Sequence, residues 1–364
     1  MNQDLYNMLL SNYIGYERLY AMTIPTLYGD RQETGTINLF IDLNSFFKRL
    51  WDPRGYTYKA DNVLAASVIN VCSHYRNYFW TRHMIKTNIY LVWGNNTPVY
   101  QSPEYNAHYR ERVASASVRG AQELLDTNIK ALEFLCPYLP QIYFINGEMN
   151  EVAGIIYTLV SNMAGKDLVN IVLTKDVYAY QLVAFCPNTF VYRPKKSYDQ
   201  ASNQMVDSSW VVTKTNLYKA MKLELGNKIT QDMPSHPRYL EFVLALSGLR
   251  VRHVKGIMTF NRACATVASL EEDRPECFQD INNFEYTVLF DTPTRCKGIG
   301  FGVPGDLVTR RNILSVVMAS EMLQKDPKYF SIMNDGIHDL YNPQAVMEIS
   351  DHEFVEYPLE LMEL

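Results

Sequence analysis

Residues 147–183 decide the predicted fold: they begin GEMNEVAGIIYTLVSNM and end IVLTKDVYAYQLV. The apolar runs 141–145 and 168–173 have the composition of short buried strands, and the residues between them carry apolar side chains at helical spacing. Glu148 and Asp176 follow directly after the two strands. The pattern therefore predicts that both acids lie at the carboxyl ends of neighbouring parallel strands, where open α/β sheets bind their ligands.

Two more strands and a long helix precede this stretch. Residues 36–41 form an apolar run that ends at Asp42, and residues 88–93 form another. Residues 62–80 have the apolar periodicity of a helix. Strands that alternate with helices predict an α/β fold with a mostly parallel central sheet.

The second half of the chain reads mainly as helices and polar connections. Pro237 opens an apolar helix that ends at Gly248, where glycine occupies the usual C-cap position. Residues 193–207 are polar and predict a crossing between domains. Residues 309–323 predict a single helix with the Thr309 hydroxyl as its N-cap.

Composition excludes several classes of protein. A length of 364 residues is sufficient for two domains. No apolar run approaches the roughly 18 residues of a membrane span, and the N-terminus lacks the pattern of a secretory signal, so we expect a cytoplasmic protein without a membrane partner. The six cysteines are scattered, which predicts reduced, buried thiols rather than a zinc site or a disulfide framework.

The net charge of −5 hides an asymmetry along the chain. Residues 193–262 carry twelve Lys and Arg against five Asp and Glu, a local charge of +7. Residues 335–364 carry eight acids and neither Lys nor Arg. A basic middle with an acidic tail indicates one surface that faces a polyanion, and a solvated charged face is the alternative.

Four acids are candidates for a metal site. Asp42, Glu148 and Asp176 follow predicted strands, and Glu151 lies one helical turn after Glu148 on the same face. Clustered carboxylates repel one another unless a cation lies between them, and Mg²⁺ prefers such oxygen ligands. The alternative is structural: acids at these positions cap helices or pair with a nearby Lys or Arg.

The order and spacing of these segments resemble the flap endonuclease and phage 5′-nuclease family. The segments that carry the resemblance are residues 41–44, 91–98, 109–112, 147–151, 172–183, 244–248, 254–257 and 311–314. The resemblance implies a PIN-like three-layer domain with a central mostly parallel sheet, followed by a helical domain of the helix-three-turn-helix type. It also implies that Asp42, Glu148, Glu151 and Asp176 are the catalytic residues and bind Mg²⁺.

The departures from the family pattern fall mainly on its acids. Gly94, Asn150, Tyr178, Leu249 and Arg252 stand where the family has carboxylates, and Asn261 stands at a glycine position. A guanidinium at position 252 opposes a dication at contact distance by about 4 kcal/mol at an effective dielectric of about 20. The remaining acids are therefore expected to hold one Mg²⁺ at most, so two-metal hydrolysis of a phosphodiester is not expected.

The resemblance also implies residues that contact DNA. Those expected to contact duplex phosphates are Arg250, Arg252, Lys255, Gly256 and Arg262. Those expected to line an arch for single-stranded DNA are Arg110, Arg112 and Arg119. Ordinary solvated helix charge is the alternative for both sets.

We expect four regions along the chain. They are a helical extension (1–35), the PIN-like 5′-nuclease domain (36–200), a helix-three-turn-helix-like DNA-binding region (201–270) and a C-terminal region with an acidic tail (271–364).

The resulting hypothesis is a degenerate, phage-encoded 5′-nuclease relative in the host cytoplasm. It binds branched or single-strand/duplex junction DNA and has weak or absent cleavage. One alternative is an active Mg²⁺-dependent 5′–3′ exonuclease or flap endonuclease. Another is a structural or assembly subunit that reuses the fold and binds a protein partner through residues 335–364.

Overall fold

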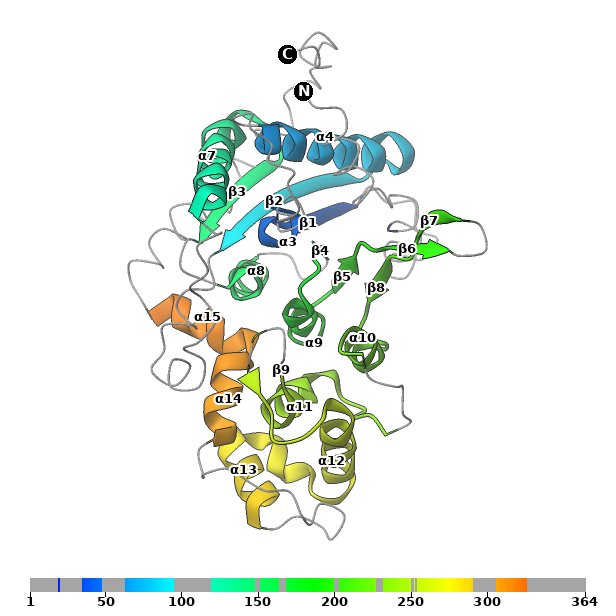
Figure 1. Cartoon of the computed structure of the whole chain (residues 1–364), viewed down its shortest axis with the longest axis vertical. Helices are drawn as coiled ribbons and strands as arrows, with labels where there is room; N and C mark the ends of the chain where they lie inside the picture. Colours follow the sequence, from blue (N-terminus) through cyan, green and yellow to red (C-terminus); the bar gives the residue numbers. More distant parts are fainter. Residues whose placement is uncertain are drawn as a thin grey trace.

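The computed structural model describes most of the residues between 35 and 325 (Figure 1). The described residues are 35–47, 63–94, 119–147, 151–163, 168–199, 203–226, 232–249, 254–290 and 306–325, together with Leu19 and Arg252. Several predictions fall outside them. These are the helical extension apart from Leu19, the acidic tail, and the residues Arg110, Arg112, Glu148 and Arg250.

A six-stranded sheet forms the centre of the upper part, in the order β3-β2-β1-β4-β5-β8. Its strands are β1 (Thr36–Asp42), β2 (Lys86–Gly94), β3 (Ile142–Gly147), β4 (Val169–Leu173), β5 (Thr189–Arg193) and β8 (Trp210–Val212). The first five run parallel, and β8 pairs antiparallel with β5. The prediction of a mostly parallel α/β sheet is confirmed.

One expectation about the sheet is wrong. β3 and β4 are not neighbours, because β2 and β1 lie between them. Sequence order does not reveal this, since a crossover helix can carry the chain past intervening strands to the far side of the sheet. β4 lies between β1 and β5, and the ends of β1 and β4, which lie side by side, are those that lead to Asp42 and Asp176.

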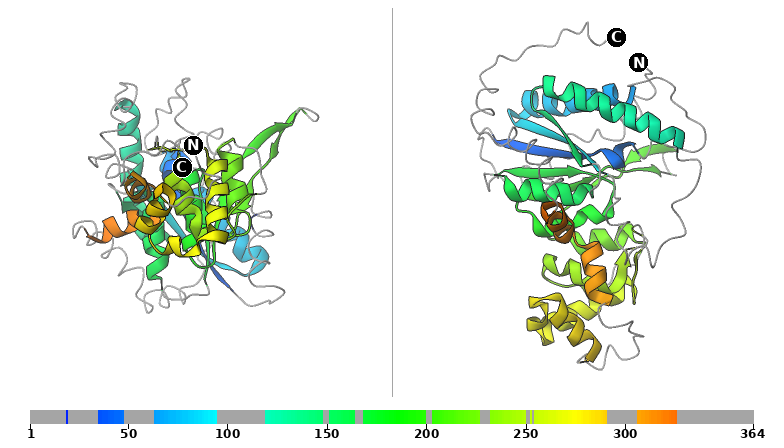
Figure 2. Two further views of the ribbon diagram at one scale, coloured as in Figure 1. Left: turned by 90° about the horizontal axis from the view of Figure 1, so that it is seen from below. Right: turned by 90° about the vertical axis from the view of Figure 1, so that its left-hand side faces the viewer.

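Helices cover both faces of the sheet, which makes three layers (Figure 2). Helices α4 (Val63–His83) and α7 (Arg119–Leu135) lie on one face, and α8 (Val152–Asn162) and α9 (Gln181–Phe185) lie on the other. Alternate residues of β1 point to opposite faces. Leu39 and Ile41 join the apolar core beneath α4 and α7, and Phe40 joins the core beneath α8 and α9.

A ladder of asparagine side chains crosses the middle of the sheet. Asn38 of β1 is level with Asn88 of β2 and Asn170 of β4. The Asn38 amide donates to Asn170 Oδ1 at 3.0 Å and accepts from Asn88 Nδ2 at 3.3 Å. A shift of one residue between neighbouring strands would break these hydrogen bonds, so the ladder helps to fix the strand register.

The lower part of the molecule is helical. It contains η4 (Pro237–Tyr239), α11 (Leu240–Ser247), the short strands β9 (Gly248–Leu249) and β10 (Val254–Lys255), α12 (Phe260–Asp273), η6 (Pro275–Gln279), α13 (Ile281–Phe290), α14 (Asp306–Leu314) and α15 (Val316–Lys325). We call β9, β10 and Arg252 between them the hairpin. Gly248 has φ 64° at the C-cap of α11, as predicted.

The helical part is firmly joined to the sheet part. One continuous apolar cluster runs from Ile155 of α8 through Leu182 of α9 to Leu246 of α11. Helix α15 returns to α8, where the Thr158 and Ser320 hydroxyls lie 2.6 Å apart. The expected region boundaries near residues 200 and 270 stay predictions, because this shared core shows no separation between the parts.

Two connections differ from the expectation. Within residues 193–207, β6 (Lys196–Asp199) and β7 (Gln204–Asp207) form an antiparallel ribbon instead of a plain crossing. Asn203 has φ 54° in the turn, a conformation that asparagine tolerates. The helix predicted over 309–323 is two helices, α14 and α15, which are separated at Ser315.

Five cysteines lie among the described residues. Cys72, Cys136, Cys186, Cys264 and Cys277 are buried and free. None of the described helices is both long and apolar enough to cross a membrane.

Candidate acidic site and nucleic-acid interface

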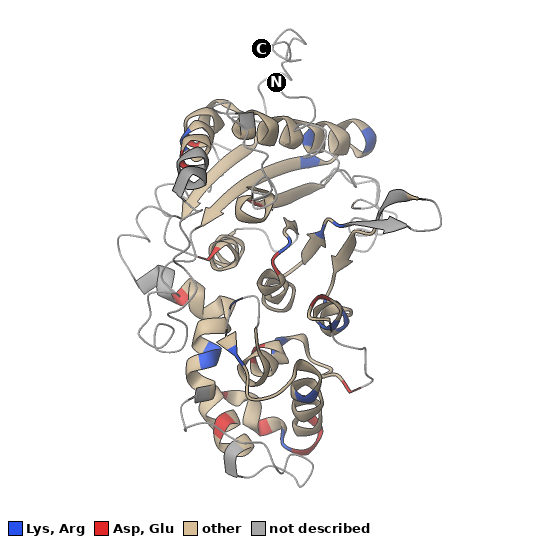
Figure 3. Cartoon of the chain, viewed as in Figure 1, with Lys and Arg blue, Asp and Glu red and all other residues tan. Residues whose placement is uncertain are grey.

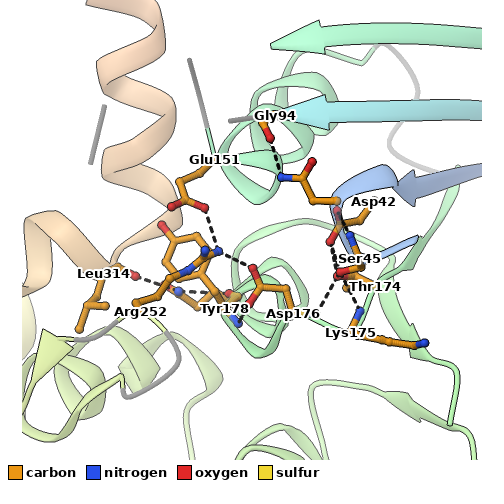
Figure 4. Close-up of polar contacts among 12 residues, drawn as sticks. Asp42, Ser45, Gly94, Glu151, Thr174, Lys175, Asp176, Tyr178, Arg252 and Leu314 are labelled. Carbon is orange, nitrogen blue, oxygen red and sulfur yellow. Dashed lines mark hydrogen bonds and ion pairs between the residues drawn. The ribbon is translucent and has the colours of Figure 1, made fainter. Parts of the chain in front are cut away.

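Asp42, at the carboxyl end of β1, is held by hydroxyl groups (Figure 4). Its Oδ1 accepts from the Ser45 backbone N–H at 3.0 Å. Its Oδ2 accepts from Ser45 Oγ at 2.5 Å and from Thr174 Oγ1 at 2.6 Å. Ser45 belongs to the short helix α3 (Leu43–Phe47) and Thr174 follows β4, so the network joins the ends of two neighbouring strands.

Asp176 lies two residues beyond Thr174 and is the N-cap residue of η3 (Val177–Tyr180). Its Oδ1 accepts from the Tyr178 backbone N–H at 3.0 Å, which is an N-cap contact, and its backbone N–H donates to Thr174 Oγ1 at 2.9 Å. Thr174 therefore connects Asp42 to Asp176. The sequence left helix capping open as a structural role for this acid. Asp176 takes that role through its Oδ1.

Glu151 stands at the N-cap position of α8 but makes no side-chain cap bond. Its carboxylate instead reaches Arg252, with Oε2 2.8 Å from Nη2. The same Nη2 contacts Asp176 Oδ2. We call Asp42, Glu151 and Asp176 the acidic site. The structure brings these three acids together from the ends of β1 and β4 and the start of α8.

Arg252 comes from the hairpin of the helical part, and its side chain is 11% exposed. Its guanidinium carbon lies 4.6 Å from the centre of the Tyr178 ring, a cation–π arrangement. Arg252 and Tyr178 both stand at positions where the family resemblance expects acids, and the structure places them in contact with each other (Figure 4).

Burial dominates the electrostatics of the acidic site. It raises the pKa of Glu151 to about 7, although the Arg252 charge opposes the rise; Asp176 and Asp42 add to it. Burial also raises the pKa of Asp42, against the hydrogen bonds from Ser45 and Thr174. Desolvation disfavours the charged form of a carboxyl group, and a nearby cation favours it.

The described acids do not fit a divalent cation. Among the residues that the structure describes, no three of His, Cys, Asp and Glu form a group that could hold a metal ion. Both oxygens of Asp42 accept hydrogen bonds, and Arg252 binds Glu151 and Asp176. The expected Mg²⁺ site is therefore not formed by these three acids as they stand, and Glu148 lies outside the described residues.

Of the residues expected to contact DNA, some are exposed and one is engaged within the protein. Lys255 of β10 and Arg262 in the first turn of α12 are exposed. Figure 3 shows basic positions on the hairpin and on α14 beside it. Arg252 instead points into the acidic site, because its guanidinium is engaged there. Arg119 is the first residue of α7, and its side chain is outside the description.

Gly256 follows β10 and packs tightly against the end of α11. A Cβ at this position would lie 2.0 Å from the Ser247 carbonyl oxygen. This close contact with Ser247 explains why a glycine stands here, since a side chain would not fit. The sequence had suggested another reason, the approach of the backbone to an anion. The anion contact stays a prediction.

Sequence reasoning missed Ser45 and Thr174 as partners of the acidic site. The signal for Ser45 was its position three residues after Asp42, the spacing of a helix N-cap contact. The signal for Thr174 was weaker, since its contact with Asp42 spans 132 residues.

Comparison with known proteins gives a likeness in structure alone. No protein-family model and no curated protein sequence matches the chain. A bacteriophage T5 protein co-crystallised with metal ions superposes with a TM-score of 0.53 and 11% identity, over 86% of this chain and 100% of that one. A bacteriophage T5 flap endonuclease, in a pseudo-enzyme–product complex with DNA and metal ions, gives 0.52 and 10% over the same shares.

Proposed function

Because the chain has the PIN-like fold of the 5′-nucleases, we propose that it binds branched or single-strand/duplex junction DNA and that its phosphodiester cleavage is weak or absent. The observation that carries this proposal is the position of Arg252. Its guanidinium contacts Glu151 and Asp176 at once, inside the acidic site.

The chemistry of a guanidinium explains why cleavage is expected to be lost. Metal-assisted hydrolysis needs a cation that activates water and stabilises the attacking and leaving oxygens. A guanidinium neutralises carboxylates, but it stays protonated in proteins and offers only N–H donors. It therefore balances the charge of the acidic site without generating a nucleophile.

The surface beside the acidic site is suited to a phosphate backbone. Lys255 and Arg262 are exposed on adjacent segments, and Thr259 caps α12 between them. The first N–H groups of a helix and its dipole favour an anion. These features supply sequence-independent contacts, which position a protein on DNA without reading its bases.

Binding is tested by fluorescence anisotropy with a labelled flap substrate over a range of salt concentrations. We expect the affinity of the wild type to fall linearly on a log–log plot against salt. K255E/R262E is expected to bind about tenfold or more weakly, with a salt slope smaller by about two.

The matched control is K86E/K130E, which changes the net charge equally. Lys86 is exposed at the amino end of β2 and Lys130 is exposed on α7, away from the carboxyl ends of the strands. The control is expected to bind like the wild type. Equal binding by K255E/R262E and the wild type would contradict the proposed surface.

Cleavage is tested on the same flap substrate in Mg²⁺ and in Mn²⁺. We expect the wild type to cut no faster than D42N/D176N, which lacks two of the acids. Cleavage by the wild type that D42N/D176N abolishes would establish an active nuclease instead.

A further inference from the structure

One nitrogen atom of Arg252 occupies the point at which two carboxylates of the acidic site meet. Nη2 contacts Glu151 Oε2 at 2.8 Å and also contacts Asp176 Oδ2. The two acids come from the start of α8 and from the end of β4, and Arg252 comes from the helical part. A positive charge at this point therefore offsets the repulsion between buried Glu151 and the partly buried Asp176.

The surroundings of Arg252 fix its guanidinium at this place. The Tyr178 ring lies 4.6 Å below it. The hairpin is tight at both ends, since a Cβ on Gly248 would lie 2.3 Å from the Val254 carbonyl oxygen and one on Gly256 would lie 2.0 Å from that of Ser247. The chain at Gly248 and at Gly256 thus has little room to shift relative to the end of α11.

The charges of the acidic site need this cation. Glu151 is 4% exposed and Asp42 is 3% exposed. Buried carboxylates without a counter-ion are strongly destabilising, whereas paired ones are tolerated. Ser45 and Thr174 donate hydrogen bonds to Asp42 but carry no charge. Among the described contacts, Arg252 supplies the positive charge between Glu151 and Asp176.

We infer that Arg252 is the permanent counter-ion of the acidic site: it takes the place of a divalent cation and closes the site to one. The same contacts tie the hairpin of the helical part to the edge of the sheet. The inference concerns the protein without DNA, so it stands or falls separately from the proposed junction binding.

The first test compares thermal unfolding of the full chain in EDTA and in Mn²⁺. We expect the midpoint of the wild type to be the same in both. A midpoint that rises in Mn²⁺, with the rise lost in E151Q/D176N, would overturn the inference, because the acids would then bind the metal while Arg252 is present.

The second test removes the guanidinium. R252M leaves two uncompensated acids, and we expect its midpoint in EDTA to fall by about 5 °C or more. Mn²⁺ is expected to restore part of the loss, because the ion can enter the vacated place and binds only the folded state. R252K, which keeps a charge in a shorter form, is expected to show a smaller loss and no response to Mn²⁺.

The triple variant R252M/E151Q/D176N separates charge from packing. With the acids neutralised, we expect this variant to recover much of the stability lost in R252M. Its unfolding midpoint is expected to be the same in EDTA and in Mn²⁺. If R252M does not fold in EDTA, recovery of folding in the triple variant still supports a counter-ion role. A triple variant no more stable than R252M, together with an R252M that Mn²⁺ does not stabilise, would show that Arg252 acts through packing alone.

Discussion

Glu151 is the residue through which pH acts most directly on the acidic site. Burial raises its pKa from the ordinary value of 4.5 to about 7, against the attraction of Arg252. Between these pH values the folded protein binds the proton that the unfolded chain releases. The contribution of Glu151 to the unfolding free energy is therefore greatest at low pH and is lost as the pH rises toward 7.

This sign gives a prediction for E151Q, whose side chain cannot ionise. From about pH 4.5 to pH 8, we expect E151Q to gain stability relative to the wild type, by at most about 3 kcal/mol. Urea unfolding of both proteins across this range measures the difference. A difference that stays constant with pH would mean that Glu151 titrates normally in the folded protein.

At the residue scale, the sequence predicted the acids of the site better than their partners. Asp42 and Asp176 were predictable because each directly follows an apolar strand, and parallel strands end at the same edge of a sheet. The contact of Arg252 with Asp176 spans 76 residues. It depends on how the helical part packs against the sheet, which local patterns do not encode.

At the scale of elements, the hairpin positions Arg252, and its glycines make it possible. Gly248 has φ 64°, and a Cβ there would also lie 2.3 Å from the Val254 carbonyl oxygen. Gly226 provides a matched comparison, because it has φ 71° but no atom within 4 Å of the place of a Cβ. The two positions share a positive φ and differ in the steric clash.

We therefore predict that G226A costs about 1 kcal/mol of stability, the cost of the left-handed conformation alone. G248A is expected to cost more, about 3 kcal/mol, because the hairpin must also move. Urea unfolding measures both. Equal losses in the two variants would show that the hairpin accommodates a side chain and does not hold Arg252 rigidly.

Element types were predictable where apolar spacing is regular. Helix α4 and strands β1 and β2 lie within a few residues of their predicted bounds. The ribbon of β6 and β7 was missed because its sequence is polar and lacks an apolar run. The break at Ser315 was missed because no glycine or proline marks it. Gln181 lies there, donating to the Leu314 carbonyl at 2.8 Å.

At the scale of the whole molecule, Arg252 of the helical part joins that part to the sheet through its ion pairs with Glu151 and Asp176, in the place where we infer that it acts as the counter-ion. We therefore predict that binding of junction DNA does not depend on divalent cations. Affinities measured in EDTA and in Mg²⁺ at matched ionic strength are expected to agree within about twofold, since salt governs the phosphate contacts. A loss of tenfold or more in EDTA would show that a metal ion takes part in binding.

The fold class was predictable from the sequence, whereas the strand order was not. Alternating strands and helices indicated a parallel sheet covered on both faces, and the structure has it. The order β3-β2-β1-β4 results from how each crossover packs on the sheet, and such long-range packing leaves no local signal. Asn38, Asn88 and Asn170 show the same limit, because their ladder is visible only once the register is known.

Whether Arg252 excludes a divalent cation is measured in a crystal of the full chain soaked in Mn²⁺, with the anomalous scattering of manganese recorded. We expect the guanidinium of Arg252 to lie between Glu151 and Asp176, and no manganese peak within the acidic site. A manganese ion bound by Glu151 and Asp176, with Arg252 turned away from them, would contradict it.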